Sequence, residues 1–213
     1  MTTTVFFTPC SRNARHSLWG WLVAILLLVG MSVPPVARSQ PVEITQLRVE
    51  RADDGLYLSA QIRLELPPIM VDTLNKGIPL HFVVEAELLR ERWYWYDRQL
   101  ALATRHIRLA YQPLTRRWRL NVASEPIGNA GQGASITQNF DSLDDALLAI
   151  QRQVRWKIAE PGLLDVDARH YVEFRFKLDT SQLPRPFQIG VVGNSEWNLS
   201  STRTQRLGSE AGK

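Results

Sequence analysis

Apolar and polar side chains alternate along much of this chain. Between residues 56 and 66 the even positions are apolar and the odd positions carry polar groups, which predicts a strand with one buried and one solvated face. Residues 42–50 precede this strand, and Asp54-Gly55 between the two segments is a common hairpin turn. The pattern therefore predicts an antiparallel hairpin at residues 42–66.

Two segments have helical spacing instead. Pro68 is followed by residues 69–76, which predict a short helix that ends at Gly77. Ser142 is a typical N-cap, and residues 142–155 predict the one well-packed helix of the chain. Its expected packing stripe is Leu143, Ala146, Leu147, Ile150 and Val154.

The alternation in residues 80–111 changes face twice, on either side of a turn expected at Asp97-Arg98. Because a shift of one residue turns later side chains to the other face, we expect a bend or paired bulge at residues 89–92 opposite residues 103–106. The expected register pairs Trp95 with Leu100, Trp93 with Leu102, Leu88 with Ile107 and Glu87 with Arg108.

A second turn at residues 112–115 returns the chain into a strand at residues 116–123. It is expected to pair Leu109 with Trp118 and Ile107 with Leu120. Residues 124–135 form a Gly-rich linker, and further strands are expected at residues 156–159, 170–178, 187–192 and 196–200. The pattern predicts a mainly β, antiparallel protein, a sandwich or partly closed barrel with one packed helix.

Residues 12–39 have the order of a secretory signal. Basic side chains precede an apolar run at residues 18–29, and the small residues Ala37 and Ser39 suit a peptidase that cuts after Ser39. The alternative is a retained inner-membrane anchor at residues 18–33, which is 16 residues long against the roughly 20 needed to span a bilayer. We therefore expect a signal peptide at 1–39, one β-rich domain at 40–207 and a disordered tail at 208–213.

Removal of this segment changes the charge and the available chemistry. The chain has 25 basic and 21 acidic residues, and residues 1–39 hold three of the basic ones and none of the acidic ones. The remaining 22 basic residues nearly balance the acidic ones, which does not favour a nucleic-acid partner, and a membrane contact is expected only through an uncleaved N-terminal segment. The one cysteine, Cys10, is also lost, so a thiol nucleophile is not expected.

The most conspicuous composition is the Arg-Glu-Arg-Trp-Tyr-Trp-Tyr-Asp-Arg run at residues 90–98. On an alternating strand, Trp93 and Trp95 are expected in the core, with the neighbouring tyrosines on the exposed face. Exposed rings beside guanidinium groups can hold sugars, peptides or anions. The candidate binding residues are Arg90, Arg92, Tyr94, Tyr96 and Arg98.

Catalytic and metal chemistry have less support. Glu85 and Glu87 share one strand face, as the paired carboxylates of a glycosidase would, but such pairs are more often simply solvated. The histidines His81, His106 and His170 have no second ligand at metal spacing, and no phosphate-binding or dinucleotide motif is present. We expect no metal, no cofactor and no catalytic residue.

Several blocks together resemble an exported family from Gram-negative bacteria, catalogued as domain of unknown function 4390. They are residues 75–80, 92–95, 111–119, 178–188 and 196–197. The resemblance covers roughly residues 42–203 and implies an exported domain with a signal peptide. It implies no activity, cofactor or catalytic residue, but it does imply genes neighbouring a membrane sensor kinase of nitrogen-regulation type, which is therefore a candidate partner.

Three hypotheses of function follow. The first is a non-enzymatic periplasmic binding or adaptor domain that uses the aromatic and arginine side chains of residues 90–98. The second is a hydrolase of envelope carbohydrate or peptide that uses Glu85 and Glu87. The third is a scaffold of an envelope complex.

Overall fold

The computed structural model of this chain describes residues 41–94, 96–126, 135–165, 168–191 and 195–208. The expected signal segment with its cleavage site at Ser39, Trp95 and the end of the expected tail lie outside these residues. Over the described ranges, no helix has both the length and the apolar character needed to span a membrane.

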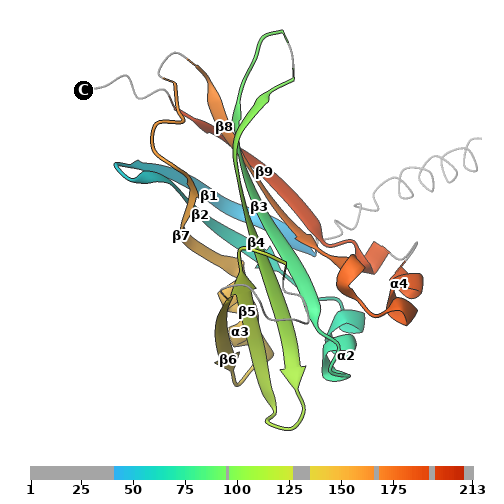
Figure 1. The fold of residues 1–213 in the computed structure, drawn as a ribbon. Coiled ribbons are helices and arrows are strands. Elements are labelled where there is room, and N and C mark those ends of the chain that lie inside the picture. Colours follow the sequence, from blue (N-terminus) through green and yellow to red (C-terminus); the bar gives the residue numbers. More distant parts are fainter. Residues whose placement is uncertain (1–40, 95, 127–134, 166–167, 192–194, 209–213) are drawn as a thin grey trace, which may run out of the picture. The chain divides into compact units, whose positions relative to one another are not determined.

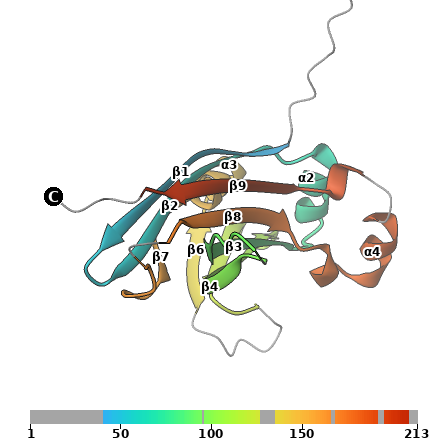
Figure 2. The ribbon, with the colours of Figure 1, turned by 90° about the horizontal axis from the view of Figure 1, so that it is seen from above.

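The described residues form two antiparallel sheets (Figures 1 and 2). One sheet has the order β1-β2-β7, with β1 at Val42–Ala52, β2 at Gly55–Leu64 and β7 at Arg152–Ala159. The other has the order β6-β5-β4-β3-β8-β9. Its strands are β3 (Leu80–Arg90), β4 (Arg98–Gln112), β5 (Arg117–Ala123), β6 (Ser135–Phe140), β8 (His170–Leu178) and β9 (Ser200–Leu207). The mainly β, antiparallel prediction is confirmed, and within the described residues the sheets do not close into a barrel.

The core lies between the sheets and follows the alternation of the sequence. The even positions of β2 from Leu56 to Leu64 are all buried, and so are the even positions of β3 from Leu80 to Leu88 and those of β8. Phe82 of β3 stacks on Phe176 of β8 with ring centroids 5.5 Å apart. Among the described residues, those buried in the core come from residues 42–199, and residues 40–213 cluster as one compact unit. These residues therefore have a core of their own.

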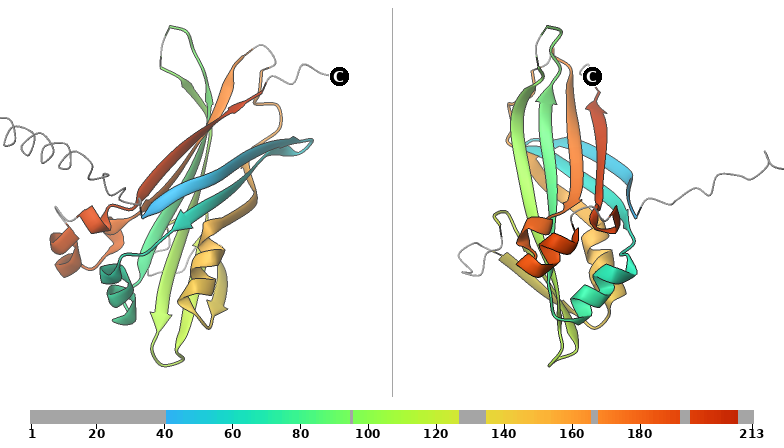
Figure 3. Two further views of the ribbon diagram at one scale, coloured as in Figure 1. Left: turned by 180° about the vertical axis from the view of Figure 1, so that it is seen from behind. Right: turned by 90° about the vertical axis from the view of Figure 1, so that its right-hand side faces the viewer.

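Arginine side chains link the two sheets. Arg203 of β9 donates hydrogen bonds of 2.7 Å to the carbonyl oxygens of Ile44 and Thr45 in β1, where a register shift interrupts the β1–β2 pairing. On another side, Arg105 of β4 donates to Gln153 of β7 at 2.9 Å. These bonds link strands that are not paired in either sheet (Figure 3).

Both helices predicted from the sequence are present. Helix α2 spans Pro68–Asn75 and is followed by Gly77 at a φ of +81°. Helix α3 spans Leu143–Gln151, and the Ser142 hydroxyl caps it by accepting a hydrogen bond of 3.1 Å from the Asp145 backbone. The predicted end of α3 is wrong, because β7 begins at Arg152 and places Val154, expected in the packing stripe, at 52% exposure.

The predicted register of the β3–β4 hairpin is also wrong. Leu88 pairs with Ala101 and Glu87 with Leu102, so the expected Glu87–Arg108 pair does not form. The connection spans residues 91–97 instead of turning at Asp97-Arg98, and this added length moves every pair. A bulge occurs at Leu88/Leu89, close to the position expected on β3, but it lies opposite residues 99–101 and not 103–106.

The following turn is predicted more closely. Leu109 pairs with Leu120 and Ile107 with Val122, two residues away from the expected partners. A shift of two keeps every side chain on its face, so the meander and its buried positions are as expected.

The predicted strand at 187–192 is wrong. The structure has helix α4 at Arg185–Val191, between the 3-10 turns η1 (Thr180–Gln182) and η2 (Ser195–Trp197). The amides of Phe187 and Gln188 donate to the Pro184 carbonyl at 2.9 and 3.2 Å. Prolines in a first helical turn preset φ without losing a helical hydrogen bond, and here they start a helix. The expected strand at 196–200 is likewise displaced, and β9 begins at Ser200.

Substitution of Gly55 is expected to destabilise the β1–β2 turn. Gly55 has a φ of +147°, and a Cβ there would lie 2.5 Å from the Ala159 carbonyl oxygen. We expect Gly55→Ala to lower the free energy of unfolding by about 1–3 kcal/mol, measured by urea unfolding. Gly208→Ala is the control, since no atom lies within 4 Å of its Cβ position. Equal stability of the two variants would contradict this prediction.

Candidate functional site

The candidate site is the connection between β3 and β4, residues 91–97, which we call the aromatic tip. It lies at the far end of the longest hairpin (Figure 1, green). Trp93 is 98% exposed, Tyr96 95% and Tyr94 78%. The expectation that Trp93 is a core residue is therefore wrong. Trp95, for which the same was expected, lies outside the described residues.

The tip is exposed because the sheet ends beneath it. Arg90 is the last residue of β3, and its partner in β8 is His170, the first residue of that strand. On the other side, β5 reaches only as far as His106 of β4. In the described part of the chain, no neighbouring strand extends far enough to cover the aromatic rings.

Hydrogen bonds hold the base of the tip to the segment that leads into β8. The Glu91 amide donates to the Arg169 carbonyl at 2.9 Å, and Tyr171 donates its hydroxyl to Asp97 at 2.6 Å. Asp97 also accepts from the Arg92 amide at 3.1 Å, which closes the tip on itself. The rings are therefore exposed on a connection whose two ends are fixed.

The bond between Asp97 and Tyr171 is stable to pH changes around neutrality. The Tyr171 hydroxyl and the Arg92 amide hold the pKa of the Asp97 carboxyl below its usual value. The same bond, with some burial, raises the pKa of Tyr171 to about 12. Carboxylate and phenol thus keep the protonation states that this bond needs at neutral pH.

The five candidate binding residues do not all have the same role. Arg92, Tyr94, Tyr96 and Arg98 are exposed at the tip or beside it. Arg90 is half-buried and forms an ion pair of 2.6 Å with Asp165, so its contact supports the base of the tip. Sequence reasoning missed Tyr171 and Asp165, which lie more than 70 residues from their partners and leave no local signal.

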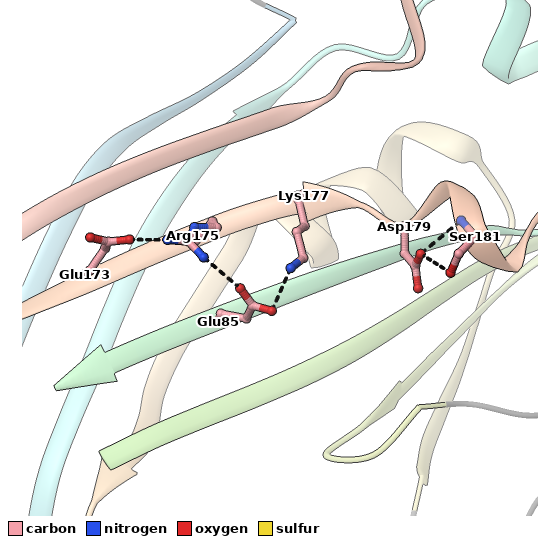
Figure 4. A network of polar contacts seen from close by, with 6 residues as sticks. All are labelled: Glu85, Glu173, Arg175, Lys177, Asp179 and Ser181. Carbon is pink, nitrogen blue, oxygen red and sulfur yellow. Dashed lines mark hydrogen bonds and ion pairs between the residues drawn. The ribbon is translucent and has the colours of Figure 1, made fainter. Parts of the chain in front are cut away.

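Glu85 and Glu87, the candidate catalytic pair, alternate with the buried positions of β3 and so lie on the outer face of the larger sheet, where Figure 4 shows Glu85. Glu85 accepts from Lys177 at 2.8 Å and from Arg175 at 3.4 Å, and Arg175 also binds Glu173. Glu87 lies between Leu102 and Glu173 in the register. This arrangement is a ladder of charged side chains across paired strands, in which both cations neutralise Glu85.

The three histidines described by the structure share a lowered pKa. Burial is the main cause for each of them, and it lowers the pKa of His81, His106 and His170 from the usual value of 6.5. His170 is 6% exposed, and its Nε2 atom has no hydrogen-bond partner among the described residues. Over the same residues, no group of three or more side chains is placed to hold a metal ion.

Because of these lowered histidine pKa values, we expect the protein to be less stable in mild acid. A histidine whose folded pKa is lowered binds protons more readily when unfolded, so its stabilisation is complete above about pH 6.5 and decreases as the pH falls below that value. We expect the urea midpoint to be lower at pH 5.5 than at pH 7.5. Asp165, Arg90 and Arg51 also act on His170, and His170→Asn should reduce the difference without reversing it. A midpoint that does not fall at pH 5.5 would contradict this.

Comparison with known proteins gives one match. A family model described as "Domain of unknown function (DUF4390)" matches residues 39–207. No curated protein and no solved structure matches the chain.

Proposed function

Because this chain belongs to the DUF4390 family, which carries no assigned activity, we propose its function from its own side chains: an exported, periplasmic adaptor domain that binds an envelope protein through the aromatic tip. The proposal includes no catalytic step. Glu85, which a hydrolase would need, is engaged by two cations.

The observation that carries the proposal is the exposure of Trp93, Tyr94 and Tyr96 on a connection with fixed ends. Exposed clusters of large apolar side chains are uncommon on soluble proteins and are typical of interaction sites. Tryptophan, tyrosine and arginine dominate binding hot spots, because each has a large contact area and a polar group at its end. Fixing the connection before binding reduces the entropy that association costs.

The charges beside the rings bear on the kind of partner. Arg92 and Arg98 are exposed beside the aromatic side chains. Of the two carboxylates there, Glu91 is exposed and Asp97 accepts a hydrogen bond from Tyr171. A surface with an apolar centre and acidic groups at its rim would fit this arrangement. The membrane sensor kinase implied by the family resemblance is one candidate to examine. Export would place the tip in the periplasm, and residues 12–39 support this location.

Site-specific photo-crosslinking tests this proposal. A benzophenone side chain in place of Trp93 is expected to give one main adduct with an envelope protein in living cells. Leu114 is the matched control, because it is 101% exposed and lies in the turn between β4 and β5, at the opposite end of β4. The absence of an adduct at residue 93, or the same adduct from residue 114, would show that the tip is not the binding site.

A further inference from the structure

A cavity of about 300 Å³ lies between the larger sheet and helix α3. Strands β4, β5 and β6 form one wall, and α3 with the start of β7 forms the other. Its lining is about equally polar and apolar, and the apolar part includes Ile107, Leu120, Val122, Ile136, Ala149 and Ile150. This volume is at the lower end of the range for small-molecule sites, roughly 300–1,000 Å³.

Two arginine side chains line this cavity, and Arg105 is the more buried of the two. Arg105 pairs with Val84, which is fully buried, so Arg105 lies on the core face of β4 together with Ile107 and Leu109. Its guanidinium lies 4.6 Å from the centroid of the Trp156 ring and donates to the Gln153 side chain at 2.9 Å. Gln153 is itself buried and is held by a second bond to the Ile150 carbonyl.

Among the described residues, Arg105 has no acidic partner, although a charged side chain on the core face of a strand normally has one. No carboxylate of the described residues contacts it or lines the cavity, and burial alone lowers its pKa. Residues 127–134, between β5 and β6, include no aspartate or glutamate in their sequence. Other arginines do have carboxylate partners, namely Arg63, Arg90, Arg117 and Arg175.

A half-buried charge without an opposite charge beside it is costly, and a bound anion would compensate it. The guanidinium is planar and presents its N–H groups in a fork that matches a carboxylate. Stacking on Trp156 and the bond to Gln153 fix the plane of that fork. Arg152, which also lines the cavity, adds a second positive charge.

We propose that this cavity binds a small anionic amphiphile, namely a carboxylate that carries a short alkyl chain. The carboxylate lies against Arg105, and the alkyl chain lies among the apolar side chains of β4, β5, β6 and α3. The cavity volume limits the chain to a short one. This ligand site is separate from the aromatic tip, so either proposal can fail without the other.

Calorimetric titration of residues 40–213, which have a core of their own, tests this inference. Octanoate is the probe, acetate provides the head group without the chain, and 1-octanol provides the chain without the charge. We expect octanoate to bind at least about tenfold more tightly than either, because both the charge-assisted hydrogen bonds and the apolar contacts contribute.

Three variants separate the role of Arg105 from general effects of charge. Arg105→Gln should weaken octanoate binding about tenfold or more. Arg108→Gln should leave it unchanged, since Arg108 pairs with His81 on the opposite face of the same strand. Arg105→Lys keeps the charge but not the fork and should bind with intermediate affinity, which gives a second reading if Arg105→Gln does not fold.

Three results would overturn the proposal. The first is no binding of octanoate to the unmodified chain. The second is equal binding of octanoate and 1-octanol, which would mean that the apolar walls act alone. The third is unchanged octanoate affinity in folded Arg105→Gln, or equal losses in Arg105→Lys and Arg108→Gln.

Discussion

Combined replacement Trp93→Ser, Tyr94→Ser and Tyr96→Ser is expected to weaken binding of the envelope partner by about 100-fold or more. A single aromatic hot spot typically contributes about 2 kcal/mol or more, and these three side chains are adjacent and exposed. The measurement is the affinity of the purified variant for the protein captured through residue 93.

The same variant should fold normally. The three rings are between 78% and 98% exposed, and exposed side chains seldom change the free energy of unfolding by more than about 0.5 kcal/mol each. Leu114→Ser, with a side chain equally exposed, should change neither stability nor affinity. Equal affinities of the triple variant and Leu114→Ser would show that the rings do not form the binding surface.

Phe176→Ala is expected to cause the largest loss of stability, about 3–5 kcal/mol in the free energy of unfolding. Phe176 is fully buried, pairs with Val84 in β3 and stacks on Phe82. Its removal would leave a cavity between the sheets that neighbouring strands cannot close. Urea unfolding measures the loss, with Leu114→Ala as the exposed control. A loss below about 1 kcal/mol would mean that the two sheets do not pack as described.

The sequence predicted the sheets where one face of a strand is buried. Residues 56–64 alternate strictly and residues 80–88 do so except at Val83, and every even position of the two segments is in the core. If such a strand were shifted by one residue, its polar side chains would turn towards the core, so the pattern alone determines which face is buried. It does not determine the register, which depends on the length of the connection.

The aromatic tip was only partly predictable. Trp, Tyr and Phe favour strands, so residues 93–96 were expected to continue β3 and β4. Whether they do depends on neighbouring strands, and β8 begins only at His170. The contacts that fix the tip, from Arg169 and Tyr171, come from more than 70 residues away in the chain. Arg92, Tyr94, Tyr96 and Arg98 are exposed as expected, whereas Arg90 is half-buried and the contacts that support the tip were not predicted.

The cavity at Arg105 was also only partly predictable from the sequence. Alternation in residues 105–109 already places Arg105 on the same face as Ile107 and Leu109. Only the fold brings Gln153 and Trp156 of β7 against it and, among the described residues, places acidic side chains elsewhere. A charged residue on a core face is a signal that sequence reasoning can use.

The proposed function is tested most directly by complementation of a strain that lacks this chain. The protein with serine at residues 93, 94 and 96 should reach the periplasm in normal amounts, as measured by fractionation, and should fail to restore the wild-type phenotype. The chain with Leu114→Ser should restore it. Full rescue by the triple variant would contradict the claim that this protein acts through its aromatic tip.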